Sequence, residues 1–442
     1  NLQITVDDLP GWNEVSEYNT ILGIGAGPTS SGTTGGSFNT SVGAGAGMSS
    51  AGTANVFLGA FSGANSDGNC NVFVGLRAGF DNESGDFGTF IGFESGYKSS
   101  GAHNTFLGYK SGANIDNNNN NIGIGSYSGR ENSGQSNVFL GVSSGEHNTG
   151  DSNVFLGNNT GACNEGNQNV FLGTDSGKIN DHGAKNVFIG YNTGEKNKSA
   201  NESVFIGNQA GASNSSGSSN VFIGHQSGLS NSTGGENVFI GSSTGAQNTG
   251  TKNVFLGHET GFENDGSNNV FLGYKTGANN DGFHNVAVGA FSARKNTGNV
   301  SVFLGLGAGE HNTGNISTII GTIAGKHNSG DNNVLMGYDV GGCNEGDENV
   351  FIGIKSGKHN KFDNNVYLGN YTGEQYQGNN DTFLGYKAGT KGHGDNNVFV
   401  GTHTGANNEG DYNVFMGVSA GHNNTGDDNV FLGYHSGYTN SS

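Results

Sequence analysis

The sequence contains little proline, little cysteine and few basic residues. Only 2 Pro and 3 Cys occur among 442 residues, and 18 Lys and Arg stand against 37 Asp and Glu. The widely spaced Cys70, Cys163 and Cys343 cannot form a disulfide framework. A net charge of −19 leaves no basic surface for nucleic acid or for an anionic membrane. We therefore expect neither of them as a partner.

Long hydrophobic runs are also absent from the sequence. No apolar stretch approaches the roughly 20 residues of a membrane-spanning helix, so we expect no membrane span. Hydrophobic residues make up 31% of the chain and charged residues 12%, whereas globular domains average about one half and about one quarter. A single large core is therefore not expected.

What the sequence has instead is Gly, Asn and Phe at fixed intervals. From Asn55 onward the pattern Asn-Val-Phe-Leu/Ile-Gly recurs every 16 or 17 residues, and Asn137 to Ser152 is a clean copy. Three Gly per repeat would each cost about 1 kcal/mol inside a helix, whereas Val-Phe-Leu closed by Gly is typical of a short strand. We predict an all-β fold, a parallel β-solenoid (β-roll) of about 24–26 coils with 16–17-residue repeats.

The first 52 residues depart from this repeat. They contain Pro10, Trp12 and Pro28, and an acidic pair at Asp7 and Asp8. Repeat arrays need atypical end units. We therefore divide the chain into a divergent N-terminal segment, residues 1–52, which caps the array or docks to another molecule, and a repeat array, residues 53–442.

Asparagine occupies two fixed positions in the repeat. Asn137 and Asn153 begin successive repeats, and Asn148 and Asn164 lie at a later position. In-register stacking would place each Asn above its equivalent, where side-chain amides can hydrogen-bond along the stack. We predict two Asn ladders with a structural role.

The strand of each repeat is apolar on both faces. Side chains alternate across a strand, so Val138 and Leu140 share one face and Phe139 lies on the other. Whichever face points inward, a stripe of large apolar side chains points outward, and such stripes mark association surfaces. We assign lateral association to the Phe column, which comprises Phe57, Phe73, Phe106, Phe139, Phe155, Phe171, Phe188, Phe205, Phe222, Phe239, Phe255, Phe271, Phe303, Phe351, Phe383, Phe399, Phe415 and Phe431.

The unit Asn-Val-Phe-Leu-Gly, followed by a small residue and a second Gly, resembles the head repeat of YadA-like trimeric autotransporter adhesins. It is also similar to Asn/Gly-rich repeats of bacterial surface proteins and phage tail fibres. The resemblance covers roughly residues 55–442. It implies a parallel β-roll that packs as a trimer.

Two columns contain residue types that ligate metals. In the first column, which is rich in His, neighbouring side chains could share a zinc or copper ion. The second column consists of Asp and could bind calcium weakly. We favour a different interpretation, a solvated loop and a solvated acidic ridge, and expect no cofactor, with weak calcium binding as the alternative. The columns are His311, His327, Cys343 and His359, and Asp395, Asp411 and Asp427.

Catalysis would need a nucleophile with its base, or a carboxylate pair, on an irregular part of the scaffold. The repeat offers neither, so we predict that the protein is not an enzyme. We predict a structural component of an extracellular or cell-surface fibre whose partner is the protein itself. The alternative is an adhesin or tail-fibre shaft that binds cell-surface glycans.

End-to-end assembly is expected from the last repeat, which begins at Asn429 with no divergent closing unit. An uncapped coil presents unpaired strand edges to another chain. The alternating segment near the N-terminus would supply the next strand. The predicted joint comprises Leu2, Ile4, Val6, Val430 and Leu432.

Overall fold

The computed structural model describes residues 18–27 and 36–441. The chain forms two compact units, Asn1–Asn220 and Val221–Ser442, called unit 1 and unit 2. Neither unit contains a helix within the described residues. Consequently, no helix there is long and apolar enough to cross a membrane.

Unit 1 is a parallel β-solenoid whose main strands pair in register with the strands one repeat away. Strands β10 and β12 pair separately, on another side of the coils. The strands are β1 (Thr20–Leu22), β2 (Thr40–Val42), β3 (Val56–Leu58), β4 (Val72–Val74), β5 (Thr89–Ile91), β6 (Thr105–Leu107), β7 (Ile122–Ile124), β8 (Val138–Leu140), β9 (Val154–Leu156), β10 (Cys163–Asn164), β11 (Val170–Leu172), β12 (Ile179–Asn180), β13 (Val187–Ile189) and β14 (Val204–Ile206).

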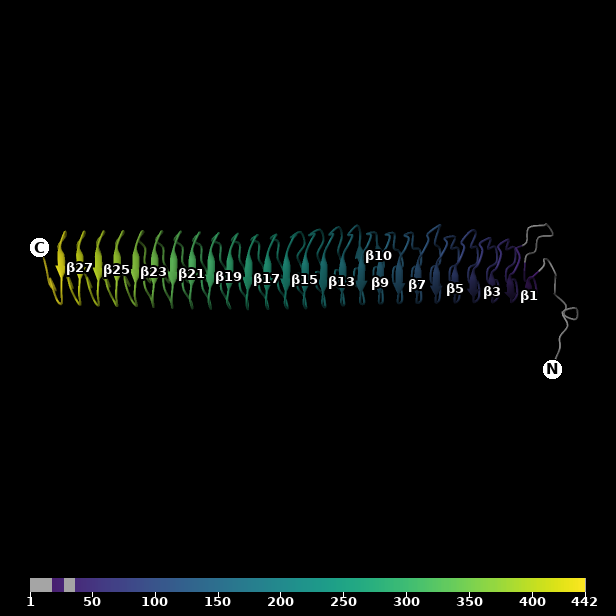
Figure 1. Ribbon diagram of the computed structural model, residues 1–442, viewed down its shortest axis with the longest axis horizontal. Helices are drawn as coiled ribbons and strands as arrows, with labels where there is room; N and C mark the ends of the chain where they lie inside the picture. The colour runs from purple at the N-terminus through teal and green to yellow at the C-terminus, as the bar shows by residue number, and fades with distance from the viewer. Residues whose placement is uncertain (1–17, 28–35, 442) are drawn as a thin grey trace, which may run out of the picture. The chain divides into compact units, whose positions relative to one another are not determined.

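Unit 2 is built in the same way, and its strands follow one another in sequence order (Figure 1). Each strand is followed by a turn and a return segment that leads to the next strand, one coil further along. The strands are β15 (Val221–Ile223), β16 (Val238–Ile240), β17 (Val254–Leu256), β18 (Val270–Leu272), β19 (Val286–Val288), β20 (Val302–Leu304), β21 (Thr318–Ile320), β22 (Val334–Met336), β23 (Val350–Ile352), β24 (Val366–Leu368), β25 (Thr382–Leu384), β26 (Val398–Val400), β27 (Val414–Met416) and β28 (Val430–Leu432).

The predicted all-β parallel solenoid with a repeat of about 16 residues is confirmed. The predicted boundary at residue 52 differs from the structure. Strands β1 and β2 lie within residues 1–52, yet β1 pairs with β2 and β2 pairs with β3 in the register of the array. Strands that begin with Thr and carry Ile (β1) or Ser (β2) in place of Phe thus form ordinary coils, because the backbone ladder does not require the aromatic ring.

The Phe column lies inside the coils. All members of the predicted assembly face except Phe431 are at most 1% exposed. Their rings stack along the array, with centroids 4.9 Å apart between Phe239 and Phe255 and 5.0 Å apart between Phe255 and Phe271. Opposite each ring the return segment supplies a Gly. At Gly261, for example, φ is +60° and a Cβ atom would overlap the ring of Phe255.

The interpretation of the Phe column as a lateral assembly face is therefore wrong. A coil of one strand and one return segment encloses room for one large side chain, and the central residue of the strand occupies it. The flanking Val and Leu or Ile point outward instead. In β17, Val254 and Leu256 are each 43% exposed, whereas Phe255 is fully buried.

The two predicted Asn ladders are confirmed. In the first column the Asn253 backbone N–H donates to Oδ1 of Asn237 at 2.9 Å, and its Nδ2 donates to the Gly266 carbonyl at 2.9 Å. In the second, Nδ2 of Asn264 donates to Oδ1 of Asn248 at 2.9 Å. These buried amides therefore hydrogen-bond to the neighbouring coil, as buried polar groups usually do.

Candidate functional site

The His column forms a stack of rings. His311 and His327 lie with ring centroids 4.8 Å apart. Burial, and then the neighbouring His327, lower the pKa of His311. All four members of the column, including Cys343 and His359, adopt a left-handed backbone conformation with φ between 57° and 62°.

No group of three or more His, Cys, Asp or Glu side chains that could hold a metal ion occurs among residues 18–27 and 36–441. The His column therefore supplies adjacent pairs at most. The Cys343 thiol is exposed and free.

The Asp column forms a third ladder. The backbone N–H of Asp395 donates to Oδ1 of Asp411 at 2.8 Å, and the N–H of Asp411 donates to Oδ1 of Asp427 at 2.8 Å. One oxygen of each accepting carboxylate thus carries a structural hydrogen bond between coils. This ladder gives the recurring Asp a structural role.

The predicted end-to-end joint is only partly within the described residues. Val430 and Leu432 lie on β28 and are each 65% exposed. Leu2, Ile4 and Val6 lie outside the described residues, so the joint stays a prediction.

Among the described residues of unit 2, the second Asn ladder is interrupted in one place. At the second Asn position, the two repeats that follow Asn360 carry Tyr376 and Gly392, and the Asn returns at Asn408. The ring of Tyr376 enters the core and packs edge-on against Phe383, with ring centroids 4.7 Å apart. Gly392 provides the space, because a Cβ atom there would overlap the Asn408 carbonyl oxygen and lie 2.8 Å from Cε2 of Tyr376.

The Tyr376 hydroxyl forms some of the hydrogen bonds between coils that the missing Asn side chains would make. It donates to the Gly394 carbonyl at 3.1 Å and accepts from Nδ2 of Asn397 at 2.9 Å. Burial raises the pKa of Tyr376 well above its usual value, so the phenol stays neutral and keeps its proton for donation. The substitution is incomplete, however, because Oδ1 of Asn360 is left buried without a hydrogen-bond partner among the described residues.

Asp381 replaces Asn in the first ladder, one strand further on. Its Oδ1 accepts the Asn397 backbone N–H at 2.7 Å, as an Asn would. Its Oδ2 stands where the ladder has a donating Nδ2, and it has no partner among the described residues. Burial in particular raises the pKa of Asp381 to about 8, so the carboxyl is mainly neutral at pH 7. A neutral carboxyl carries an O–H donor and thereby resembles the amide that it replaces.

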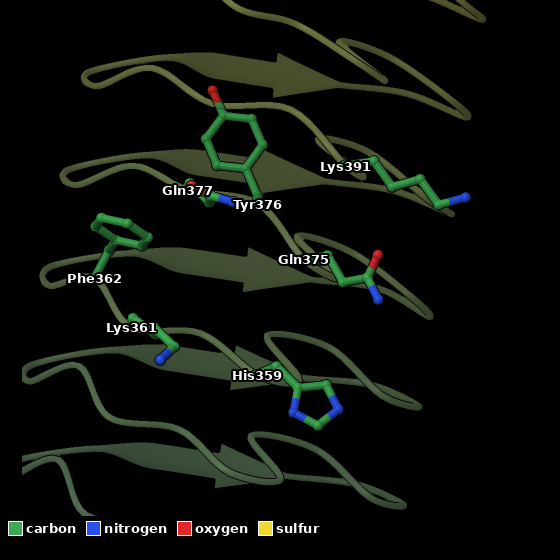
Figure 2. Close-up of a pocket in the computed structure, with 7 residues that line it drawn as sticks. All are labelled: His359, Lys361, Phe362, Gln375, Tyr376, Gln377 and Lys391. Atoms are coloured by element: carbon green, nitrogen blue, oxygen red, sulfur yellow. The ribbon is translucent and has the colours of Figure 1, made fainter.

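A pocket of about 660 Å³ opens beside these irregular coils. Its lining comes from the return segments of three successive coils, in front of the strands (Figure 2). Phe362, which is half-buried, occupies the turn position held by Gly346 and Gly378 in the adjacent coils. The lining residues are His359, Lys361, Phe362, Gln375, Tyr376, Gln377 and Lys391.

Sequence reasoning placed only His359 of this set among its candidates. The signal for the rest was present, since Phe362, Tyr376, Asp381 and Gly392 each break a column that is otherwise nearly uniform. A search for repeated residues passes over such exceptions. Reading each column for its deviations would have located the site.

Comparisons with known proteins identified no relative of this chain. No protein-family model, no curated protein and no solved structure matches it.

Proposed function

We propose that this chain is a structural component of an extracellular fibre, and that a second copy of the chain covers the aliphatic face of its strands. The supporting observation is the outward Val and Leu stripe of unit 2, formed by the first and third residues of β15–β28. Twelve of these fourteen strands begin with Val, two begin with Thr, and all end in Val, Leu, Ile or Met.

The size of this stripe fits a specific interface. From transfer energies, an aliphatic side chain removes roughly 100 Å² of apolar surface from water when it is fully buried. The outward-facing Val and Leu side chains of β17 and β18 are 41–43% exposed. Across β15–β28 the stripe therefore offers about 1,000 Å², above the roughly 800 Å² per partner that specific interfaces bury.

A second copy is the partner that the chemistry of the stripe favours. No charged side chain occupies the first or third position of these strands, although the chain carries a net charge of −19. Two stripes can therefore meet without bringing like charges together, and two in-register sheets can pack face to face at about 10 Å. Stacked ladders on the other sides of each coil would stiffen such a fibre element.

The test is analytical ultracentrifugation of the full chain at about 20 µM. Leu256→Lys combined with Leu272→Lys places two charges on the stripe, and we expect this variant to sediment as monomer while the unaltered chain sediments as an oligomer. The matched control is Asn268→Lys combined with His284→Lys, at the exposed position where Lys252 already stands in an earlier repeat. A monomeric unaltered chain, or equal dissociation of both variants, would contradict the proposal.

The pocket beside Tyr376 favours a second role, recognition of a ligand by the irregular coils of the same fibre element. Real proteins tend to break their own local rules at functional sites. Unsatisfied buried atoms at Asn360 and Asp381 are such breaks, and they lie in the coils that form the pocket.

A further inference from the structure

The charge of the pocket is opposite to that of the chain. Three of its seven lining residues, His359, Lys361 and Lys391, are cationic or can become so, and none is acidic. By contrast, a depression elsewhere in unit 2 is lined by Glu263, Asp265 and Asp281. A pocket in which the side chains that can carry charge near neutral pH are all basic, on an acidic protein, selects for an anionic ligand.

The lysines are available for such a ligand. Lys361 lies 3.2 Å from Glu345, but both side chains are more than half exposed, and exposed pairs of this kind contribute little energy. No carboxylate lies within ion-pair distance of Lys391 among residues 18–27 and 36–441. The two lysines come from coils two steps apart, roughly 10 Å along the stack. A ligand that engages both must therefore be extended.

The remaining lining residues suit a sugar. Phe362 presents an aromatic ring to one side of the pocket, while Gln375 lies on the side of Lys391 and His359 (Figure 2). Aromatic rings pack against the C–H face of a sugar, and amide side chains both donate to and accept from hydroxyl groups. Ligand pockets combine apolar surface and a few polar groups in this way.

Other anionic polymers fit the pocket less well. A peptide added as a strand needs free backbone groups, but the Gln377 N–H already donates to the Gly392 carbonyl and the His393 N–H to the Asn408 carbonyl. A nucleic acid needs many phosphate contacts to overcome the repulsion of an acidic protein, and the pocket offers only two lysines and one histidine.

We infer that this pocket binds an acidic oligosaccharide, with a sugar ring against Phe362 and its carboxylate or sulfate groups against Lys361 and Lys391. The inference rests on the second proposed role and names its ligand class. It is independent of lateral association, because the pocket lies on the return segments and the Val and Leu stripe lies on the strands.

The test is calorimetric titration of the full chain with a hyaluronan hexasaccharide, which carries carboxylates, and with a neutral chitin hexasaccharide of equal length. We expect binding of the acidic probe only, weakening as salt rises. Lys391→Ala should bind it about tenfold more weakly, the loss of one charge-assisted contact. Phe362→Gly, which restores the residue of the adjacent turns, should also weaken binding. Lys252→Ala, an exposed lysine elsewhere in unit 2, is the matched control and should bind normally.

Three outcomes would overturn the inference. The first is a folded, unaltered chain that does not bind the acidic hexasaccharide, and the second is an equal loss in the Lys252→Ala control. The third is equal binding of a hexaglutamate peptide that is also abolished by Lys391→Ala, which would identify an anion site without saccharide specificity. Circular dichroism establishes that each variant is folded, and ultracentrifugation of the same samples tests the fibre proposal separately.

Discussion

Two stretches of unit 2 follow the same repeat but differ in how their buried polar groups are hydrogen-bonded. Between residues 237 and 300 the Asn of each coil bonds to the Asn of the next, as Asn280 does to Asn264 and Asn296 to Asn280, both at 2.9 Å. Between residues 360 and 397 the buried Asn360 Oδ1, Tyr367 hydroxyl and Asp381 Oδ2 have no partners among the described residues. In the regular stretch repetition thus supplies the buried amides with partners, whereas the exceptions leave buried polar atoms without one.

The largest expected effect is that of pH on Asp381. Its pKa rises from 3.8 in a free carboxyl to about 8 in the fold. The folded state therefore holds its proton more tightly than the unfolded state, and this contribution to stability is full below pH 4 and is lost as pH rises through 8. At about 1.4 kcal/mol per pH unit, the loss is at most about 6 kcal/mol.

Asp381→Asn should remove that loss, so the variant should be more stable than the unaltered chain at pH 9 and about equal to it at pH 4. Urea unfolding followed by circular dichroism measures both. The reciprocal change, Asn269→Asp in the regular stretch, should install a similar loss, since Asn269 Nδ2 donates to the Gly282 carbonyl at 2.9 Å. Identical pH profiles for Asp381→Asn and the unaltered chain would contradict the role given to this carboxyl.

A smaller effect is expected from the Tyr376 and Gly392 pair. Gly392→Asn alone should destabilise the chain by about 2 kcal/mol, because the new side chain overlaps the Tyr376 ring and the Asn408 carbonyl, and overpacked cores cost energy. Adding Tyr376→Asn should recover part of this loss, because it removes the ring and gives Asn360 Oδ1 its donor, while the close approach of the new side chain to the Asn408 carbonyl remains. A double-mutant cycle measures the coupling. Simple additivity of the two changes would show that the residues do not compensate each other.

The smallest effect is expected at Tyr367, whose ring replaces Phe in the core stack. Its hydroxyl is buried without a partner among the described residues, and burial raises its pKa well above the usual value. Tyr367→Phe should therefore stabilise the chain by about 1 kcal/mol. Tyr376→Phe should destabilise the chain instead, because the Tyr376 hydroxyl donates a hydrogen bond to the Gly394 carbonyl. Urea midpoints of the two variants that shift in the same direction would refute this contrast.

Much of the fold could be predicted from the repeat, because in-register stacking depends only on period and residue type. The spacing of Asn253 and Asn269 was sufficient to predict a ladder. The direction of Phe255 was not, since Val254, Phe255 and Leu256 are all apolar and alternation does not say which face is inside. The candidate pocket was missed for a related reason, because Tyr376 and Gly392 differ from the repeat in sequence but meet only in the folded core.

The sequence by itself determined the period, the all-β solenoid in each unit and the two Asn ladders, because a strand of three residues closed by Gly and repeated every 16 or 17 residues can satisfy its backbone only by stacking on itself. Only the tertiary structure decided that Phe fills the interior while Val and Leu face outward, because the width of a coil admits one large side chain between strand and return segment. It likewise decided that Phe362, Tyr376 and Lys391 border one pocket, because stacking brings residues 14 or 15 apart in the sequence into adjacent coils.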